Sequence, residues 1–235
     1  MSIKSILLAL IAGDGAKPQG AIDYAVSLAA ANGAHLSVVV GAIKVPVVVY
    51  SGVAEVQAIV ADENDTRTDK ADELSEAIRN AAQTAGVSAA VEVVTDAIDP
   101  LFSRIGKRAR LHDFCICGRP RPDDVWATEL AETLLLSSGR PTILAPDGFD
   151  PRHADDLVAG AALAPMLAHH GVKVTVTNLP YSRDVGKTIV EHAQNTRAQM
   201  IVMGAYAHSR LRQMVLGGTT TTLLQYSPVP VLMAH

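Results

Sequence analysis

Three short segments of this chain occur twice, and this internal repeat constrains the fold more than any other feature. The segment FCICG at 114–118 is matched by MIVMG at 200–204, PTILA at 141–145 by PVLMA at 230–234, and the Gly-Val pair at 86–87 by another at 171–172. The copies lie 86, 89 and 85 positions apart. Such near-constant spacing indicates two tandem copies of one domain.

The first copy reads as alternating strands and helices. Its opening run, residues 3–12, is apolar almost throughout and ends at glycines, as in a strand buried on both faces of a parallel sheet. Further strands are expected at 35–41, 90–94, 113–118 and 141–145, with helices at 18–32, 62–85, 100–110 and 124–138 and a linker at 42–60. This order predicts an α/β fold with a doubly wound, mostly parallel sheet.

The two copies are unequal in length. The first occupies residues 1–146, whereas only 147–235 remain for the second. After the boundary the chain is predicted to enter a helix at 154–169 that corresponds to the long helix of the first copy. The second copy is therefore expected to lack its first strand, first helix and second strand.

Composition excludes several classes of protein. With 49% hydrophobic residues and a net charge of −4, the chain has enough apolar surface to fold. It has no cluster of Lys and Arg, which nucleic-acid binding requires, and aromatic residues make up only 4%. No apolar run is long enough to span a bilayer. We expect a cytoplasmic protein with no nucleic-acid or membrane partner.

The two cysteines suggest burial rather than chemistry. Cys115 and Cys117 are the only cysteines, and their spacing on a strand places both thiols on one face. We expect both to lie in the core, and we expect no metal site. The glycine-containing segment 13–20 matches no standard phosphate-binding motif, so it is not assigned a ligand.

The segment most suited to ligand binding lies near the end of the chain. It leaves an expected strand at Gly204, crosses a basic loop and enters a helix at Gly217-Gly218. Free N–H groups at a helix start favour an anion, glycines allow a phosphate to approach, and threonine hydroxyls can donate to it. The candidate nucleotide-binding residues are Gly204, Ala207, Gly217, Gly218, Thr219 and Thr220. An equally weighted alternative is that this segment binds no ligand, that the two glycines form a tight turn and that Thr219 is an N-cap.

These residues resemble the universal stress protein family in its tandem bacterial form, with the adenine nucleotide alpha hydrolase-like fold. Nucleotide-binding members carry a Gly-x2-Gly-x9-Gly-Ser/Thr loop that holds the ribose and phosphates of ATP. Gly204 and Gly217 match it, whereas Ala207 stands in place of the second glycine and Gly218 in place of the hydroxyl residue. The resemblance also implies that the last strands of the two copies, at 141–145 and 229–234, pair within the chain.

The first copy departs further from the family pattern. Binding members usually have an Asp just after the first strand, where this chain has Ile11 and Ala12, with Asp14 slightly later. Its loop at 118–124 is short and contains Pro120 and Pro122, which have no N–H to offer a phosphate. We expect no nucleotide site in this half.

The resemblance implies a non-enzymatic stress-response module that binds an adenine nucleotide, ATP or AMP, at the second glycine loop, in a homodimer. No catalytic residue is assigned, because no general base or Mg²⁺-binding carboxylate stands next to the loop. Two alternatives remain: a weak ATP hydrolase or autophosphorylating enzyme that uses the same loop, and a structural dimerisation module without nucleotide.

Overall fold

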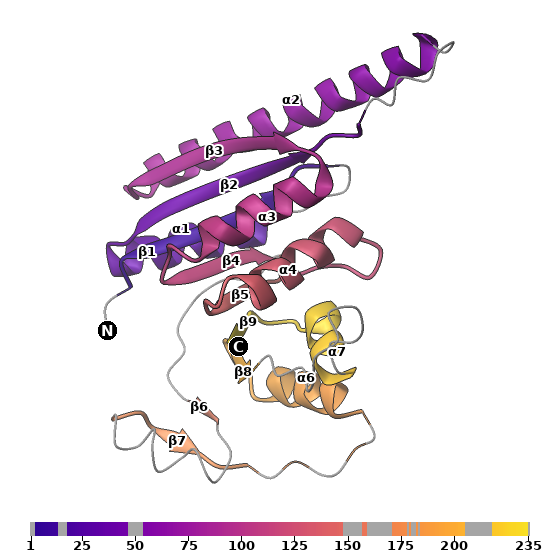
Figure 1. Ribbon diagram of the computed structural model, residues 1–235. Helices are drawn as coiled ribbons and strands as arrows, with labels where there is room; N and C mark the ends of the chain where they lie inside the picture. The colour runs from indigo at the N-terminus through magenta and orange to yellow at the C-terminus, as the bar shows by residue number, and fades with distance from the viewer. Residues whose placement is uncertain are drawn as a thin grey trace.

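A seven-stranded, mostly parallel sheet organises the molecule (Figure 1). The computed structural model describes residues 3–13, 18–46, 54–147, 157–158, 171–177, 179, 182, 184–204 and 218–234. The strands of the sheet, in spatial order, are β3 (Ala89–Asp96), β2 (His35–Ile43), β1 (Ser5–Ile11), β4 (Phe114–Gly118), β5 (Thr142–Ala145), β9 (Val231–Ala234) and β8 (Ile201–Gly204). The predicted α/β fold class is confirmed.

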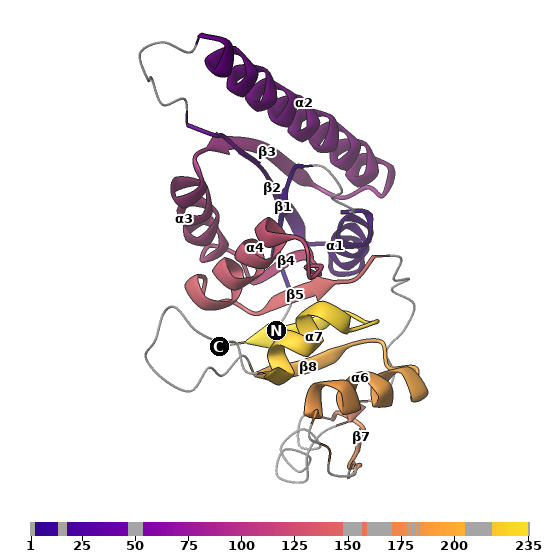
Figure 2. The ribbon, with the colours of Figure 1, turned by 90° about the vertical axis from the view of Figure 1, so that its right-hand side faces the viewer.

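Helices cover both faces of this sheet (Figure 2). One face packs against α1 (Gln19–Asn32) and α2 (Ala54–Thr84). The other packs against α3 (Ile98–Ala109), α4 (Val125–Ser137), α6 (Val185–Asn195) and α7 (Gly218–Tyr226). The central strands are therefore buried on both sides, which explains why β1 is apolar throughout.

The two cysteines lie in the core, as predicted. Cys115 and Cys117 are fully buried, unpaired residues of β4 that pack on the face covered by α3 and α4. Burial raises the pKa of the Cys115 thiol to about 12 and that of Cys117 further still. Both thiols therefore stay protonated and act as small apolar side chains.

Two sequence predictions fail in detail. Helix α2 begins at Ala54, within the segment predicted to be a linker, because residues 54–61 contain good helix formers and no breaker. Strand β6 (Leu157–Val158) lies inside the helix predicted at 154–169 and pairs in parallel with β7 (Val174–Thr175). A short apolar segment fits either state, and the pairing partner decides between them. The remainder of that predicted helix lies outside the described residues.

The C-terminal part joins the sheet through an antiparallel pair, as the family resemblance implied. Thr142, Ile143 and Leu144 of β5 lie opposite Met233, Leu232 and Val231 of β9. Strand β8 then continues the sheet in parallel with β9. The edge of β5 is thereby occupied within the chain.

One close backbone contact fixes α1 against the end of β5. A Cβ atom at Gly20 would lie 2.2 Å from the carbonyl oxygen of Pro146 and 3.0 Å from the Cα of Asp147. Only glycine permits this approach without a backbone shift.

We therefore expect Gly20→Ala to destabilise the protein by about 1–3 kcal/mol, although Gly→Ala in a helix ordinarily stabilises. Urea denaturation measures the change. Gly106→Ala in α3 is the matched control, since its new methyl group would meet only the side chains of Thr133 and Ser137 at 3.3 and 3.5 Å. A Gly20→Ala protein as stable as wild type would contradict the backbone contact.

Candidate functional site

A cavity of about 290 Å³ opens at the carboxyl ends of β1, β2 and β4. The strand order places β1 between β2 and β4, and the helices that lead away from β1 and into β4 lie on opposite faces of the sheet. Ligands of open α/β sheets bind in the crevice at this kind of topological switch point. The fold alone therefore marks this cavity as the candidate site.

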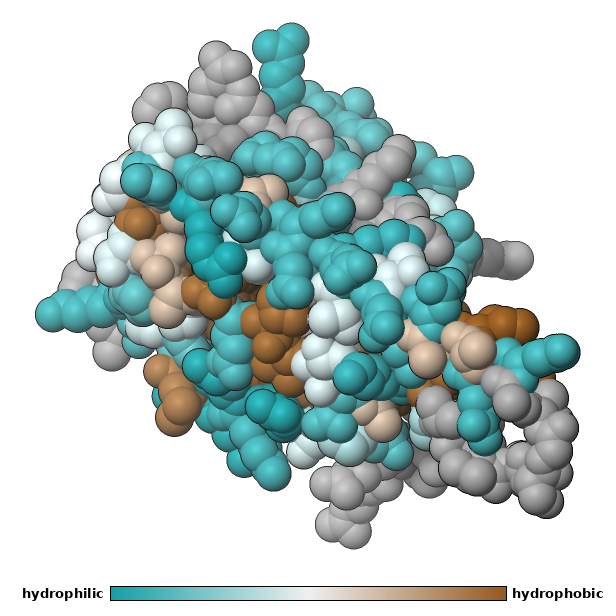
Figure 3. Space-filling model, turned by 90° about the horizontal axis from the view of Figure 1, so that it is seen from above, coloured by the Kyte–Doolittle hydropathy of each residue, from teal (hydrophilic) through white to brown (hydrophobic). Residues whose placement is uncertain are grey.

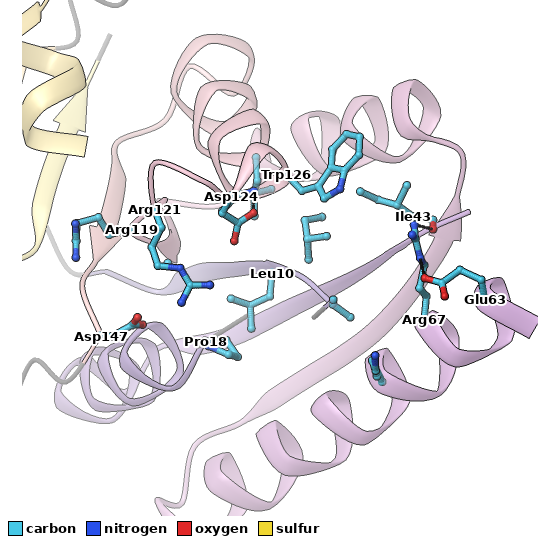
Figure 4. Close-up of a pocket in the computed structure, with 17 residues that line it drawn as sticks. Leu10, Pro18, Ile43, Glu63, Arg67, Arg119, Arg121, Asp124, Trp126 and Asp147 are labelled. Atoms are coloured by element: carbon cyan, nitrogen blue, oxygen red, sulfur yellow. Dashed lines mark hydrogen bonds and ion pairs between the residues drawn. The ribbon is translucent and has the colours of Figure 1, made fainter. Parts of the chain in front are cut away.

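The floor of the cavity is apolar and its rim is charged (Figure 4). Leu10, Ile43 and Leu130 contribute apolar surface, and Trp126 stands at one side with 37% of its surface exposed. The charged lining residues are Arg67, Lys70, Arg119 and Arg121, with Glu63, Asp124 and Asp147. A ligand that is flat, partly apolar and anionic suits this lining.

The α2 side of the cavity is held by an ion pair. The Nε of Arg67 donates to Oε1 of Glu63 at 2.9 Å, one helical turn away, and its Nη1 donates to the carbonyl oxygen of Ile43 at 3.2 Å. Arg67 is thus oriented by two acceptors and closes the side of the cavity opposite Arg121 (Figure 4).

The α4 side is shaped by a helix cap. Oδ1 of Asp124 accepts a hydrogen bond of 2.9 Å from the backbone N–H of Ala127, so the chain's own carboxylate occupies one of the free N–H groups at the helix start. An anion in this cavity would therefore meet a carboxylate at the start of α4 and guanidinium groups elsewhere in the lining. Figure 4 shows Arg121 pointing toward Leu10 and Pro18 from the side of the cavity opposite Arg67.

Arg119 connects the cavity with the C-terminal part of the chain. It follows β4 directly, and its Nη1 donates to the carbonyl oxygen of Gln225 near the end of α7. A cation at a helix C-terminus interacts favourably with the helix dipole. Burial lowers the pKa of Arg119, and the nearby Asp147 carboxylate opposes this shift.

The glycine loop predicted from the sequence is only partly described. Strand β8 ends at Gly204 and α7 begins at Gly218, so the expected strand and helix frame the loop. Thr219 is half-buried and Thr220 is buried with 7% exposure. Ala207 and Gly217 lie outside the described residues. The nucleotide site on this loop stays a prediction.

The sequence did not reveal this cavity, because the residues that line it lie far apart along the chain. Arg67, Arg121 and Trp126 come from α2, the loop after β4 and α4, and they match no motif. Gly13, in the segment to which no ligand was assigned, also lines the cavity. The usable signal was positional, since the first and fourth strands of such a sheet end at its switch point.

Metal and membrane sites receive no support from the described residues. Among them, no group of three His, Cys, Asp or Glu side chains is placed to hold a metal ion. None of the helices in the described part of the chain combines the length and apolarity needed to cross a bilayer.

Comparison with known proteins gives consistent results. Residues 136–235 match the sequence model of the universal stress protein family. A universal stress protein of Synechocystis sp. is 37% identical over 46 residues, a segment that covers 20% of this chain and 16% of that protein.

Solved structures match over nearly the whole chain. A universal stress protein from Archaeoglobus fulgidus superposes with a TM-score of 0.71 at 16% identity, covering 98% of this chain and 96% of the other. A protein of unknown function from Pseudomonas aeruginosa gives a TM-score of 0.58 at 16% identity, over 99% and 92% of the two chains. At such identities the likeness is one of fold.

The cap at α4 makes a testable contribution to the site. We expect Asp124→Ala to lower the free energy of unfolding by about 1 kcal/mol and Asp124→Asn by only a few tenths, because asparagine caps nearly as well. Asp123→Ala is the control, since that neighbouring carboxylate is 87% exposed and its contact with Arg121, at 4.0 Å, is a surface ion pair that contributes little to stability. Equal urea midpoints for Asp124→Ala and Asp123→Ala would show that the cap is not formed.

Proposed function

We propose that the chain belongs to the universal stress protein family, whose sequence model matches residues 136–235, and that it is a non-enzymatic ligand-binding module. In this proposal the cavity at β1, β2 and β4 takes an adenine mononucleotide. The observation that carries this proposal is the cavity's lining, in which Trp126 and Arg121 border an apolar floor at the switch point of the sheet. This places the nucleotide in the first half of the chain, where the sequence led us to expect none.

Each part of a nucleotide has a matching surface. The base can lie on the apolar floor beside the indole of Trp126, because aromatic rings offer flat contact area and favourable stacking. The phosphate can accept paired hydrogen bonds from the planar guanidinium of Arg121. Such a pairing needs no N–H group from the proline-containing loop.

Size and charge favour a monophosphate over a triphosphate. Pockets for small molecules typically measure about 300–1,000 Å³, so a cavity of about 290 Å³ lies at the small end. Asp124, at the start of α4, would also repel additional phosphate groups. AMP is therefore preferred over ATP as the ligand.

The glycine loop is a second candidate for the same ligand class. It is supported by Gly204 at the end of β8 and Gly218 at the start of α7, which stand at the two ends of the predicted loop. The two sites are distinguishable, because they use different residues.

Trp126 is the only tryptophan of the chain and lines the cavity, so its fluorescence reports occupancy directly. We expect a saturable change in emission on titration with AMP. Arg121→Gln should weaken the affinity about 10- to 100-fold, because a charged hydrogen bond contributes about 1.5–3 kcal/mol. Arg104→Gln should leave the affinity unchanged, because Arg104 lies beside Asp96 and does not line the cavity.

Calorimetry on Gly217→Arg assigns the site. If Gly217→Arg binds AMP as tightly as wild type does, the cavity is supported as the site. If Gly217→Arg loses AMP binding and Arg121→Gln keeps it, the glycine loop is the site. An absence of saturable binding of both AMP and ATP refutes the nucleotide proposal. Phosphate release from ATP above the level of both variants would favour the hydrolase alternative.

A further inference from the structure

The sheet has two ends, and they differ in length. Because β9 pairs with β5, the terminal strands are β3, with 8 residues, and β8, with 4. No strand in the described part of the chain pairs with the outer side of β3. Viewed from above, the end of the molecule formed by α2 and β3 shows hydrophobic residues between hydrophilic ones (Figure 3).

The hydrogen-bonding groups on the outer side of β3 follow from its register. The N–H groups of Leu36 and Lys44 on the β2 side donate to the carbonyl oxygens of Ser88 and Asp96, so even-numbered residues face β2. Because these groups alternate along a strand, Val91, Val93 and Thr95 direct theirs outward. Arg79 of α2 donates to the outward carbonyl oxygen of Val91 at 3.3 Å, an exposed and long contact.

A groove accompanies this edge on the α3 side. It measures about 300 Å³, and its floor consists of the buried side chains of Val39, Val94 and Ile105. Its polar rim is Arg104, Lys107, Arg108 and Glu92, and Leu111 at its border is 78% exposed. An extended segment that pairs with β3 would place every second side chain along this groove, and alternating apolar and acidic residues would suit it.

Strand β3 itself has this pattern. Its residues on the α3 side include Glu92, Val94 and Asp96, in the order acidic, apolar, acidic. Arg108 pairs with Glu92, and Arg104 lies 3.6 Å from Asp96, yet both guanidinium groups remain about half exposed and can donate hydrogen bonds to further carboxylates. We propose that β3 pairs antiparallel with β3 of a second copy of this chain, which joins two sheets about a two-fold axis.

Charge fixes the register of this pair. The outward N–H and C=O groups of odd-numbered residues must pair with those of odd-numbered residues in the second copy. The face covered by α3 in one sheet is then continuous with the same face in the other. Centring the axis on Glu92 would bring two carboxylates face to face, and centring it on Val94 would oppose Glu92 to Asp96. Centring it on Val93 opposes Glu92 to Val94 and Val91 to Thr95, and it keeps nearly the full length of the strand paired.

Val93→Pro tests the interface without breaking the fold. Proline removes the outward N–H group of Val93, whereas the hydrogen bonds to β2 come from its even-numbered neighbours. In light scattering over a range of concentrations, wild type and the control Val93→Thr should be dimers, and Val93→Pro should be a monomer with an unchanged far-ultraviolet circular dichroism spectrum. Arg79→Ala, which frees the carbonyl oxygen of Val91, should tighten the dimer.

Introduced thiols test the register. Paired Cα atoms at such a position lie about 5.5 Å apart, within reach of a disulfide, so Val93→Cys should form covalent dimers on oxidation. Thr95→Cys is the matched control, because position 95 lies opposite position 91 and not itself. A monomeric wild type, a dimer that persists in Val93→Pro, or equal cross-linking of both cysteine variants would overturn the proposal. These outcomes are independent of nucleotide binding.

Discussion

The antiparallel pairing of β5 with β9 is the contact on which the rest of the architecture depends. It joins the C-terminal part of the chain to a sheet whose other neighbouring strands run parallel. It also carries α6 and α7 to the face already covered by α3 and α4, so that one apolar layer runs across both parts. The end of α7 thereby comes within reach of Arg119, at the rim of the cavity.

The same pairing decides which strands of the sheet keep an edge without a neighbouring strand. Strand β5 would otherwise end the first half, but its edge is filled by β9, and its four residues are fully buried or nearly so. Association with another chain through the sheet would therefore use one of its two ends. Strand β3 is the longer of these, and the guanidinium groups of α3 beside it complement the acidic residues of another β3 strand.

The cavity illustrates how a helix start can be used in two ways. An uncapped helix N-terminus attracts phosphate, whereas Asp124 supplies a carboxylate to the N–H of Ala127 and thereby stabilises α4. The positive charge of the site then comes from side chains on separate elements, Arg67 on α2 and Arg121 after β4. A site built in this way leaves no compact signature in the sequence.

Local residues allowed much of the fold to be predicted. The apolar runs at β1 and β4 predicted central strands, since only strands buried on both faces tolerate such composition. Gly33 predicted the end of α1, where its φ of 59° lies in the left-handed region. The start of α2 was missed although Val56 and Ile59 stand three residues apart, as on one face of a helix. These side chains are 52% and 67% exposed, so burial does not account for this part of the helix.

The sequence by itself determined the alternation of strands and helices, the repeat and the burial of both cysteines, because each depends on short-range patterns of apolar residues. Only the tertiary structure decided that β6 is a strand and that residues from β1, α2, the loop after β4 and α4 meet in one cavity. Those outcomes depend on pairing partners and on side chains that are distant in the chain, and no local pattern encodes them.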